Sequence, residues 1–575
     1  MPARTSPMLA CLLCLLLMLP SLVATAQPPI IEGERFHPQP GQHAMVVTSH
    51  TLASQAGRDI LREGGNAVDA AVAIGFALAV VQPRSGNIGG GGFMVISDEK
   101  SDHVTSIDYR ETAPAGAFET MFQDDQGNVI EKASRFSANA SGVPGTVAGM
   151  AMALERYGSM SLDRVMAPAI RLARDGFAIP PRFADGLNGS REQLEKNDGT
   201  RRLFYKADGS DWHAGEVFRQ PELAATLTRI AQNGPREFYE GETADHLIDT
   251  IKAHDGIMTR EDLKGYRAVE RAPVHGTYRG YDIYAMAPPS SGGVHIVQIL
   301  NMLENDDLTA MGHGSAATMH LMSEAMRRAY ADRSKYLGDP DFFDVPVEAL
   351  TSKAYARELR AQISPDRATP SDAIGPGNLT PYESNETTHY SVADDSGLAV
   401  SNTYTLNFSY GSGIAVPEAG FLLNNEMDDF SAKAGVPNAF GLIGGEANAV
   451  APGKRMLSSM TPTIVKRDGK NLLITGSPGG SRIITTTLEV ISNVIDHGMN
   501  VQSAVSAPRF HDQWLPDEVR VEDGFSPDTL RLLEGMGHHV VRKSAMGASQ
   551  SILINRDGFQ GGADPRRETS SAIGL

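Results

Sequence analysis

The residues with the clearest capacity for chemistry lie in the run Asn385-Glu386-Thr387-Thr388-His389. A threonine hydroxyl is a weak nucleophile until a base lies beside it, and the α-amine of the same residue can be that base. Cleavage between Glu386 and Thr387 would create such an amine. These residues alone leave open the alternative of an ordinary threonine-rich hairpin.

The residues after Glu386 predict a β-hairpin. Residues 387–394 and 398–407 are rich in Thr, Tyr and Val, and a glycine-containing turn separates them. The expected pairing register places Thr405 opposite Glu386. We therefore expect the Thr405 hydroxyl beside the scissile bond.

A second run with catalytic capacity is the turn Gly476-Ser477-Pro478-Gly479-Gly480. It follows a predicted strand, 472–475, and precedes a helical pattern, 483–495. Paired glycines at such a turn let backbone N–H groups approach a developing negative charge closely. A plain turn remains open as an alternative. Phosphate binding is disfavoured because the Walker spacing and its lysine are absent.

These groups must be positioned by a fold that mixes strands and helices along the whole chain. Helical periodicity covers residues 53–81, with a break at Gly64-Gly65, and recurs at 147–155 and 317–336, whereas strand patterns cover 93–98 and 104–108 and return after Thr387. No linker, repeat or low-complexity tract interrupts them. Outer helices around a strand-rich core indicate a layered α/β fold.

The segment directly before the proposed cut differs from the rest of the chain. Residues 361–386 are rich in Pro, Gly, Ser and Asp and lack periodicity. A mobile tail is expected here, which would let the new amine be uncovered after cleavage, and an ordinary surface loop is the alternative.

The first 26 residues predict a secretory signal peptide. They hold one basic residue, Arg4, an apolar run over 8–19, and the small-x-small site Ala24-Thr25-Ala26. The apolar run is too short to span a membrane, and no other run approaches that length. The mature protein is expected to start near Gln27 and to be periplasmic or secreted.

Composition excludes several classes of function. Both cysteines lie in the signal peptide, so disulfides, cysteine catalysis and cysteine metal sites are excluded from the mature chain. Loss of Arg4 leaves 50 basic and 69 acidic residues, a net charge of −19. This charge argues against nucleic acid and anionic membrane surfaces as partners.

Two further patterns resemble binding motifs. Gly89 to Gly92 form a glycine run, but its spacing does not match a dinucleotide fingerprint, so we expect close backbone approach in the core. His313 and His320 fall on one helical face without further ligands, which favours ordinary core or surface histidines over a metal site.

The hairpin residues together resemble the signature of the γ-glutamyltranspeptidase family: Thr387-Thr388-His389, Ser391, Val392, Gly397, Val400, Thr403, Thr405, Asn407 and Tyr410-Gly411. Leu398 departs from the pattern, which usually has a small polar residue there, and should affect only turn packing. The likeness runs from about Ala44 to the C-terminus. It implies a four-layer αββα sandwich of the N-terminal-nucleophile hydrolase type, cut into a large subunit (27–386) and a small subunit (387–575) that form one folding unit.

The resemblance also implies a role for each candidate site residue. Thr387 is the nucleophile, Thr405 assists it, and Gly479 and Gly480 form the oxyanion hole. The substrate-binding residues implied by matching motifs are Arg110, Ser458 and Ser459 for the α-carboxylate, Glu426 and Asp429 for the α-amine, and Asn407 for a further hydrogen bond. Residues 433–448 resemble a lid loop in which Phe440 replaces a common tyrosine, so a latching hydroxyl is lost. No cofactor or metal is implied.

The implied function is that of a self-cleaving γ-glutamyltransferase and glutathione hydrolase. Its substrates are glutathione and other γ-glutamyl compounds, and its acceptors are water, amino acids or dipeptides. One alternative is a cephalosporin acylase acting on glutaryl groups, but such a substrate has no α-ammonium for Glu426 and Asp429. The other alternative is an inactive binding homologue of the periplasm, but such a protein is expected to have lost Thr387, the glycine pair or Arg110.

Overall fold

Two antiparallel β-sheets of seven strands each form the centre of the computed structural model, which describes residues 37–130, 132–374, 387–433, 435–436, 442 and 444–575. The first sheet has the order β21 (Ser571–Gly574), β2 (Ala44–Thr48), β10 (Thr388–Asp394), β11 (Leu398–Thr405), β3 (Gly91–Asp98), β4 (His103–Tyr109) and β7 (Val269–Arg271). The second has the order β1 (Gln39–Gly41), β20 (Gly558–Ala563), β19 (Gln550–Asn555), β15 (Lys470–Thr475), β14 (Thr463–Arg467), β9 (Tyr281–Ala285) and β8 (Val274–Tyr278). Both sheets contain strands from the two sides of Thr387.

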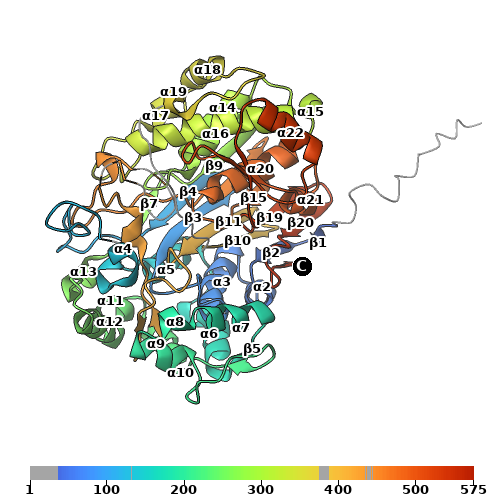
Figure 1. Cartoon of the computed structure of the whole chain (residues 1–575). Coiled ribbons are helices and arrows are strands. Elements are labelled where there is room, and N and C mark those ends of the chain that lie inside the picture. Colours follow the sequence, from blue (N-terminus) through green and yellow to red (C-terminus); the bar gives the residue numbers. More distant parts are fainter. Residues whose placement is uncertain (1–36, 131, 375–386, 434, 437–441, 443) are drawn as a thin grey trace, which may run out of the picture. The chain divides into compact units, whose positions relative to one another are not determined.

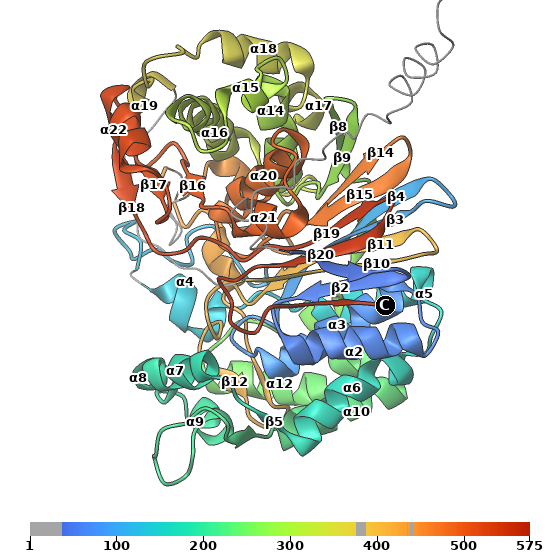
Figure 2. The ribbon, with the colours of Figure 1, turned by 90° about the vertical axis from the view of Figure 1, so that its right-hand side faces the viewer.

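Helices cover the outer face of each sheet. The first sheet is covered by α2 (Thr51–Arg62), α3 (Ala67–Val81) and α5 (Thr146–Tyr157), and the second by α14 (Gly292–Leu303), α20 (Arg482–Ile495) and α21 (Val501–Ser506). Further out lie α6 (Leu162–Asp175) and α10 (Pro221–Asn233) on one side and α16 (Ala316–Tyr336) on the other. Figures 1 and 2 show the strands between these two groups of helices.

The two sheets pack face to face over a buried apolar layer. Alternate side chains of facing strands fill it, among them Val47, Val95, Ala393, Ile474 and Ile552. Because each sheet buries one face against the other and one against helices, central strands such as β10 and β11 are buried on both faces. This arrangement confirms the predicted four-layer αββα sandwich.

The expected helices and strands at the N-terminal end are confirmed. The predicted break at Gly64-Gly65 separates α2 from α3, and Gly64 adopts a left-handed φ of +91°. Asn66 starts α3 with a capping box, in which its side chain accepts hydrogen bonds from the backbone of Val68 and Asp69.

The hairpin of β10 and β11 is present, but its predicted register is wrong by one residue. Ala393 pairs with Ala399, and this register continues to place Thr405 opposite Thr387 rather than opposite Glu386. β10 ends at Asp394, which pairs with Ala44 of β2 and whose side chain accepts hydrogen bonds from the backbone N–H groups of Ala67 and Ser396, and β11 begins at Leu398. The turn therefore has three residues and closes at a left-handed glycine, a common hairpin geometry.

The run Gly89 to Gly92 confirms the expected close backbone approach. A Cβ atom on Gly90 would lie 2.1 Å from the carbonyl oxygen of Thr405, and one on Gly92 would lie 2.5 Å from that of Thr403. Only glycine allows β3 and the segment before it to lie this close to β11.

His320 is buried on α16, whereas His313 lies in the turn before that helix, so the prediction that the two share one helical face is wrong. The Nδ1 atom of His320 lies 2.7 Å from Nε2 of His538, and its Nε2 atom donates to the carbonyl of Ser364. In the described ranges, no group of three or more His, Cys, Asp or Glu side chains could hold a metal ion.

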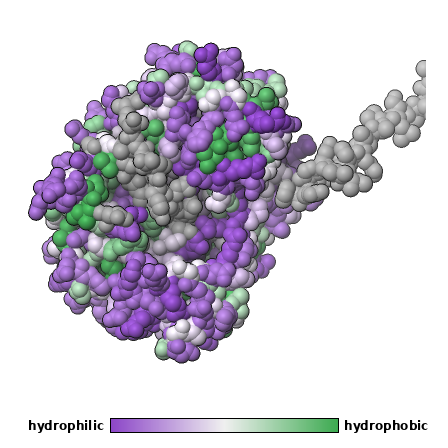
Figure 3. All heavy atoms as spheres, in the orientation of Figure 1, coloured by the Kyte–Doolittle hydropathy of each residue, from purple (hydrophilic) through white to green (hydrophobic). Residues whose placement is uncertain are grey.

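The face drawn in Figure 3 is mostly hydrophilic, with small separate hydrophobic patches. The large apolar side chains that are most exposed among the described residues are Phe118, Ile130, Phe342 and Leu532. None of the helices in the described part of the chain is long and apolar enough to cross a membrane.

Candidate active site

The candidate residues from distant parts of the chain line one hollow. It encloses about 290 Å³ of space, part of it open to solvent. Its walls are Arg110, Thr387, Thr405, Asn407, Glu426, Asp429, Leu442, Ser458, Ser459, Met460, Gly480 and Ile483. Every predicted site residue is therefore in the wall except Gly479, which is adjacent to Gly480.

Strand pairing explains why these residues meet. Thr405 at the end of β11 pairs with Gly91 at the start of β3, and Gly92 pairs with Tyr109 at the end of β4. The residue after Tyr109 is Arg110. Thr387, which precedes β10, lies at the same edge of the sheet.

Thr387 is buried beside a second hydroxyl. Its Oγ1 atom lies 3.4 Å from Oγ1 of Thr405, and Oγ1 of Thr405 accepts a 2.8 Å hydrogen bond from the backbone N–H of Asn407. Asn407 has a left-handed φ of +77°, a strained conformation for a residue with a side chain. Its side chain donates to the carbonyl of Asn425, which connects the end of β11 to the segment that carries Glu426.

Asn87 holds the end of β11 from the other side. Its Nδ2 atom donates to the carbonyl of Thr405 at 2.8 Å, and its Oδ1 atom accepts from the N–H of Gly90. Asn87 was not predicted from the sequence, because only the fold shows that its amide satisfies a backbone carbonyl beside the nucleophile.

A buried ion cluster forms one wall of the hollow. The Arg110 guanidinium donates from Nη1 to Oε2 of Glu426 and from Nη2 to Oδ2 of Asp429, both at 2.5 Å. Both acids belong to the 3-10 helix η2 (Glu426–Asp429). Burial disfavours the charged guanidinium, but the neighbouring carboxylates outweigh it and raise the pKa of Arg110. Burial raises the pKa of both carboxyl groups, although Arg110 opposes that shift.

Glu111 adds a third carboxyl group that was not predicted from the sequence. Its Oε2 atom lies 3.6 Å from Nη1 of Arg110, and its side chain is fully buried. Neither carboxyl oxygen has a hydrogen-bond partner among the described residues. Burial raises the pKa of Glu111 to about 8, against the opposing charge of Arg110.

Arg333 on α16 is a second buried cation behind the hollow. It donates to hydroxyl oxygens only, from Nη2 to Ser459 at 3.3 Å and from Nε to Ser291 at 3.1 Å. Burial lowers the pKa of Arg333 to about 10, and Asp429 opposes this shift. No carboxylate within the described part of the chain forms an ion pair with it. The sequence carried no signal for this residue, because it is one of three arginines on α16.

The glycine pair lies between β15 and α20, as predicted. Gly479 and Gly480 have φ angles of +136° and +57°, which residues with side chains rarely adopt. Neither backbone N–H donates a hydrogen bond to another described residue. These N–H groups thus remain able to bind an oxyanion at the edge of the hollow.

The predicted lid is only partly described. Leu442 lines the hollow, whereas Phe440 lies outside the described residues, as do Glu386 and the predicted signal peptide. At the end of the lid segment, the Asn448 side chain donates to the carbonyl of Asp429 at 2.7 Å. The lid function itself stays a prediction.

The chain is similar to known proteins over most of its length. The family model described as Gamma-glutamyltranspeptidase matches residues 53–574. The glutathione hydrolase proenzyme of Escherichia coli (strain K12) is 56% identical over 549 residues, which are 94% of this chain and 94% of that protein.

Solved structures show the same architecture. The cephalosporin acylase from Bacillus halodurans superposes with a TM-score of 0.82 at 28% identity, over 96% of this chain and 99% of that chain. The Helicobacter pylori γ-glutamyltranspeptidase superposes with a TM-score of 0.56 at 49% identity, over 59% of this chain and 97% of that chain.

Proposed function

The chain belongs to the γ-glutamyltranspeptidase family, and we propose how each residue of its site serves the reactions of a self-processing glutathione hydrolase and γ-glutamyltransferase. The observation that carries the proposal is the Thr387 hydroxyl beside Thr405, in the same hollow as Arg110 and Asp429. A nucleophile, oxyanion donors and charged partners for an amino acid head group are thereby brought within one site.

The first reaction is cleavage of the chain itself. Oγ1 of Thr387 attacks the carbonyl carbon of Glu386, and the C–N bond breaks while the nitrogen takes up the hydroxyl proton, so that an ester forms and the α-amine of Thr387 is freed. Water then hydrolyses the ester, which releases the Thr387 hydroxyl and the carboxylate of Glu386. Thr405 supports this step because its hydroxyl lies 3.4 Å from the attacking oxygen. The products are a large subunit (27–386) and a small subunit (387–575).

The second reaction is acyl transfer. The free amine of Thr387 takes the proton of its own hydroxyl, which then attacks the γ-carbonyl carbon of glutathione. The N–H groups of Gly479 and Gly480 stabilise the oxyanion of the tetrahedral intermediate. The amine portion leaves with a proton, and a γ-glutamyl ester remains on Thr387. Water or the amine of an amino acid or dipeptide then takes the γ-glutamyl group. These steps use no metal or organic cofactor.

Recognition of the γ-glutamyl head group is an exchange of ionic partners. The substrate α-carboxylate binds Arg110, assisted by the hydroxyls of Ser458 and Ser459. The substrate α-ammonium binds Glu426 and Asp429, with Asn407 as a further hydrogen-bonding group. In the structure Arg110 pairs with both acids. When the zwitterionic head group binds, its carboxylate can take the place of the acids beside Arg110, and its ammonium can take the place of Arg110 beside the acids.

This pairing distinguishes the reaction from that of a glutaryl acylase. A glutaryl group has a carboxylate but no ammonium, so it would compete for Arg110 and leave two buried acids without a cation. The amine-binding pair therefore supports γ-glutamyl compounds as substrates. Export to the periplasm or the medium is also proposed, on the basis of the predicted signal peptide.

The proposal is tested by expressing the full chain and following two properties. A denaturing gel with N-terminal sequencing should show a smaller fragment that begins at Thr387. The cleaved protein should hydrolyse a γ-glutamyl anilide faster than a glutaryl anilide. Arg110→Ala should lower kcat/KM for the γ-glutamyl anilide by about ten- to a hundredfold, the effect of losing a charged hydrogen bond. Wild-type efficiency in this variant would contradict the role of Arg110.

A further inference from the structure

A buried segment, Met546 to Ser549, lies directly behind the turn that carries the glycine pair. The N–H of Ala548 donates to Oγ of Ser477 at 3.0 Å, and Oγ of Ser549 donates to the carbonyl of Gly476 at 2.9 Å. Gly547 fits only as glycine, because a Cβ atom on it would lie 2.5 Å from Oγ of Ser477. The position of the turn is thus coupled to this segment through direct hydrogen bonds.

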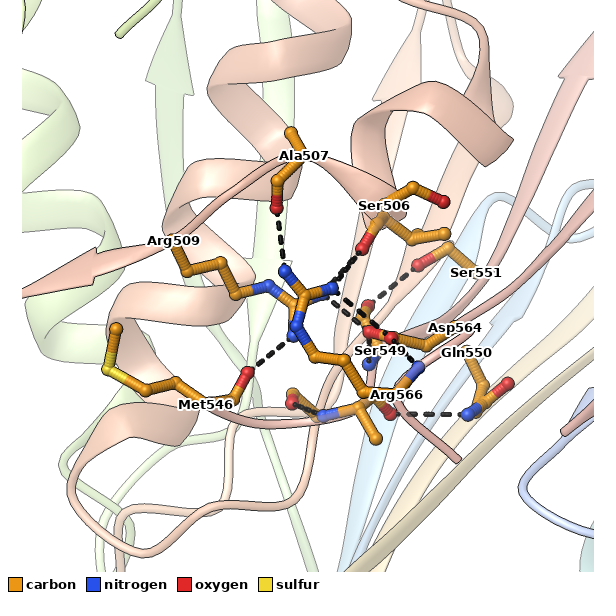
Figure 4. Close-up of polar contacts among 12 residues, drawn as sticks. Ser506, Ala507, Arg509, Met546, Ser549, Gln550, Ser551, Asp564 and Arg566 are labelled. Atoms are coloured by element: carbon orange, nitrogen blue, oxygen red, sulfur yellow. Dashed lines mark hydrogen bonds and ion pairs between the residues drawn. The ribbon is translucent and has the colours of Figure 1, made fainter. Parts of the chain in front are cut away.

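The C-terminal end of the segment is attached to Asp564, which follows β20. Oδ2 of Asp564 accepts from the N–H of Ser549 at 2.8 Å and from Nη2 of Arg509 at 2.5 Å. Oδ1 accepts from the N–H of Arg566 at 2.9 Å and from its Nη1 at 3.2 Å. Figure 4 shows Asp564 between the two arginines and next to Ser549.

The N-terminal end of the segment is attached to the same ion cluster. The carbonyl of Met546 accepts from Nη1 of Arg509 at 2.6 Å, and its N–H donates to Oε1 of Glu522 at 2.5 Å. Arg566 donates from Nε to the same oxygen of Glu522 at 2.9 Å. Asp564 is fully buried and Arg509 is 2% exposed, so water does not compete for these bonds.

We propose that Asp564 is a positioning residue for the oxyanion hole, acting through Ser549 and the segment Met546 to Ser549. The inference rests on the proposed function, because it assigns the oxyanion role to the glycine pair. Charge on Asp564 holds Arg509, Arg566 and the Ser549 N–H together, and the segment transmits that position to Gly476 and Ser477. The glycine N–H groups are thereby aimed before the substrate binds, which is what electrostatic stabilisation of a transition state requires.

The test uses Asp564→Asn in the full chain, purified in the cleaved form. Asparagine keeps the size and one acceptor oxygen, but it turns the other oxygen into a donor that faces N–H groups. We expect kcat for a γ-glutamyl anilide to fall by about tenfold or more, since loss of a whole oxyanion donor lowers kcat by about 10²–10³. KM should change by less than about twofold, because the head-group residues keep their positions.

A second readout separates positioning from general damage. A γ-boronic acid analogue of glutamate becomes tetrahedral when Oγ1 of Thr387 adds to boron, and one boron oxygen then occupies the oxyanion hole. In Asp564→Asn, inhibition by this analogue should weaken about as much as kcat falls, whereas inhibition by free glutamate should be unchanged. Equal weakening of both inhibitors, or unchanged kcat, would overturn the proposal.

The matched control is Asp496→Asn. Asp496 is also buried in an ion pair, 2.8 Å from Nε of Arg279, but it follows the far end of α20 from the glycine pair. With 14 residues in α20, the two ends of that helix lie about 20 Å apart. This variant should lose thermal stability without a change in kcat or in the inhibition constant of the boronate.

If Asp564→Asn does not fold or is not cleaved, Ser549→Ala replaces it. Alanine keeps the N–H that donates to Asp564 and removes only the hydroxyl that holds Gly476. We expect a several-fold loss of kcat and of boronate affinity with unchanged glutamate inhibition; retention of both would overturn the proposal. A wild-type protein that is cleaved but inactive on γ-glutamyl substrates would instead contradict the proposed function.

Discussion

Thr387, just before β10, and Thr405, at the end of β11, lie opposite each other at the ends of two central strands of the first sheet, with their hydroxyl oxygens 3.4 Å apart. The register of β10 and β11 creates this pair, and the N–H of Asn407 fixes the Thr405 hydroxyl by donating to it. The Thr387 hydroxyl donates to the Thr405 hydroxyl, which makes Thr405 a local partner of Thr387.

The first prediction concerns cleavage. Scaling the 61.6 kDa chain by residue number, the fragments 27–386 and 387–575 should have masses of about 39 and 20 kDa. Thr387→Ala should remain a single chain on a denaturing gel. Thr388→Val is the matched control, because it removes a hydroxyl bonded to Ser49 rather than one in the hollow, and it should be cleaved. A small fragment that begins at any other residue would contradict the assignment.

The second prediction separates the effect of the Thr405 hydroxyl from the effect of the size and shape of its side chain. Thr405→Val removes the partner of the Thr387 hydroxyl and leaves the N–H of Asn407 without its acceptor. Cleavage in this variant should slow by about 10²-fold, as for loss of a group that assists proton transfer. Thr405→Ser keeps the hydroxyl and should be cleaved at close to the wild-type rate. The cleavage rate of each variant is measured from the appearance of the two fragments on denaturing gels over time. Equal cleavage rates for Thr405→Val and Thr405→Ser would exclude a role for the hydroxyl.

The hairpin shows what short-range sequence patterns can predict. Strand composition and the glycine turn located β10 and β11 correctly, because both signals lie within a few residues. The register prediction was wrong by one position, and Asp394 at the end of β10 accepts a hydrogen bond from the N–H of Ala67, which is distant in the chain. A contact of this kind has no signature in the residues of the hairpin.

The charged residues behind the hollow show the same limit. The predicted ligands belong to recognisable motifs, and the fold brings them into one hollow. Glu111 and Arg333 belong to the same electrostatic system, but an isolated Glu or Arg is usually a surface residue. Only the packing of α16 behind Ser459 reveals that Arg333 is buried beside the substrate-binding wall.

The third prediction concerns Arg333. Its positive charge is expected to orient the Ser459 hydroxyl and to favour a substrate carboxylate. Arg333→Met should raise KM for a γ-glutamyl anilide by about tenfold with a smaller effect on kcat, as for lost binding that is equal in the ground and transition states. The effect should shrink for a substrate whose α-carboxylate is amidated. Lys335→Met, an exposed change on the same helix, is the control and should leave KM unchanged.

The fourth prediction concerns pH and stability. The pKa of Glu111 is about 8 in the folded protein, well above its ordinary value of 4.5. Between these two pH values the unfolded chain releases a proton that the folded protein retains, so this group lowers stability progressively as pH rises through that window. Glu111→Gln removes the effect. The difference in Tm between Glu111→Gln and wild type should therefore increase between pH 5 and pH 8 and then level off. A difference in Tm that does not depend on pH would contradict a raised pKa for Glu111.

The last prediction tests substrate choice through Asp429. This carboxylate pairs with Arg110 in the structure and is proposed to bind the substrate α-ammonium. Asp429→Asn keeps the size and one acceptor oxygen but removes the negative charge, so a γ-glutamyl substrate should lose more binding than a glutaryl substrate, which has no ammonium. The ratio of kcat/KM for a γ-glutamyl anilide to that for a glutaryl anilide should therefore fall by about tenfold, the effect of a lost charged hydrogen bond. Asp428→Asn, a neighbouring change in η2 at a carboxylate that accepts from Ser134, should leave the ratio unchanged. An unchanged ratio in Asp429→Asn, or a wild type that prefers the glutaryl substrate, would favour the acylase reaction over γ-glutamyl transfer.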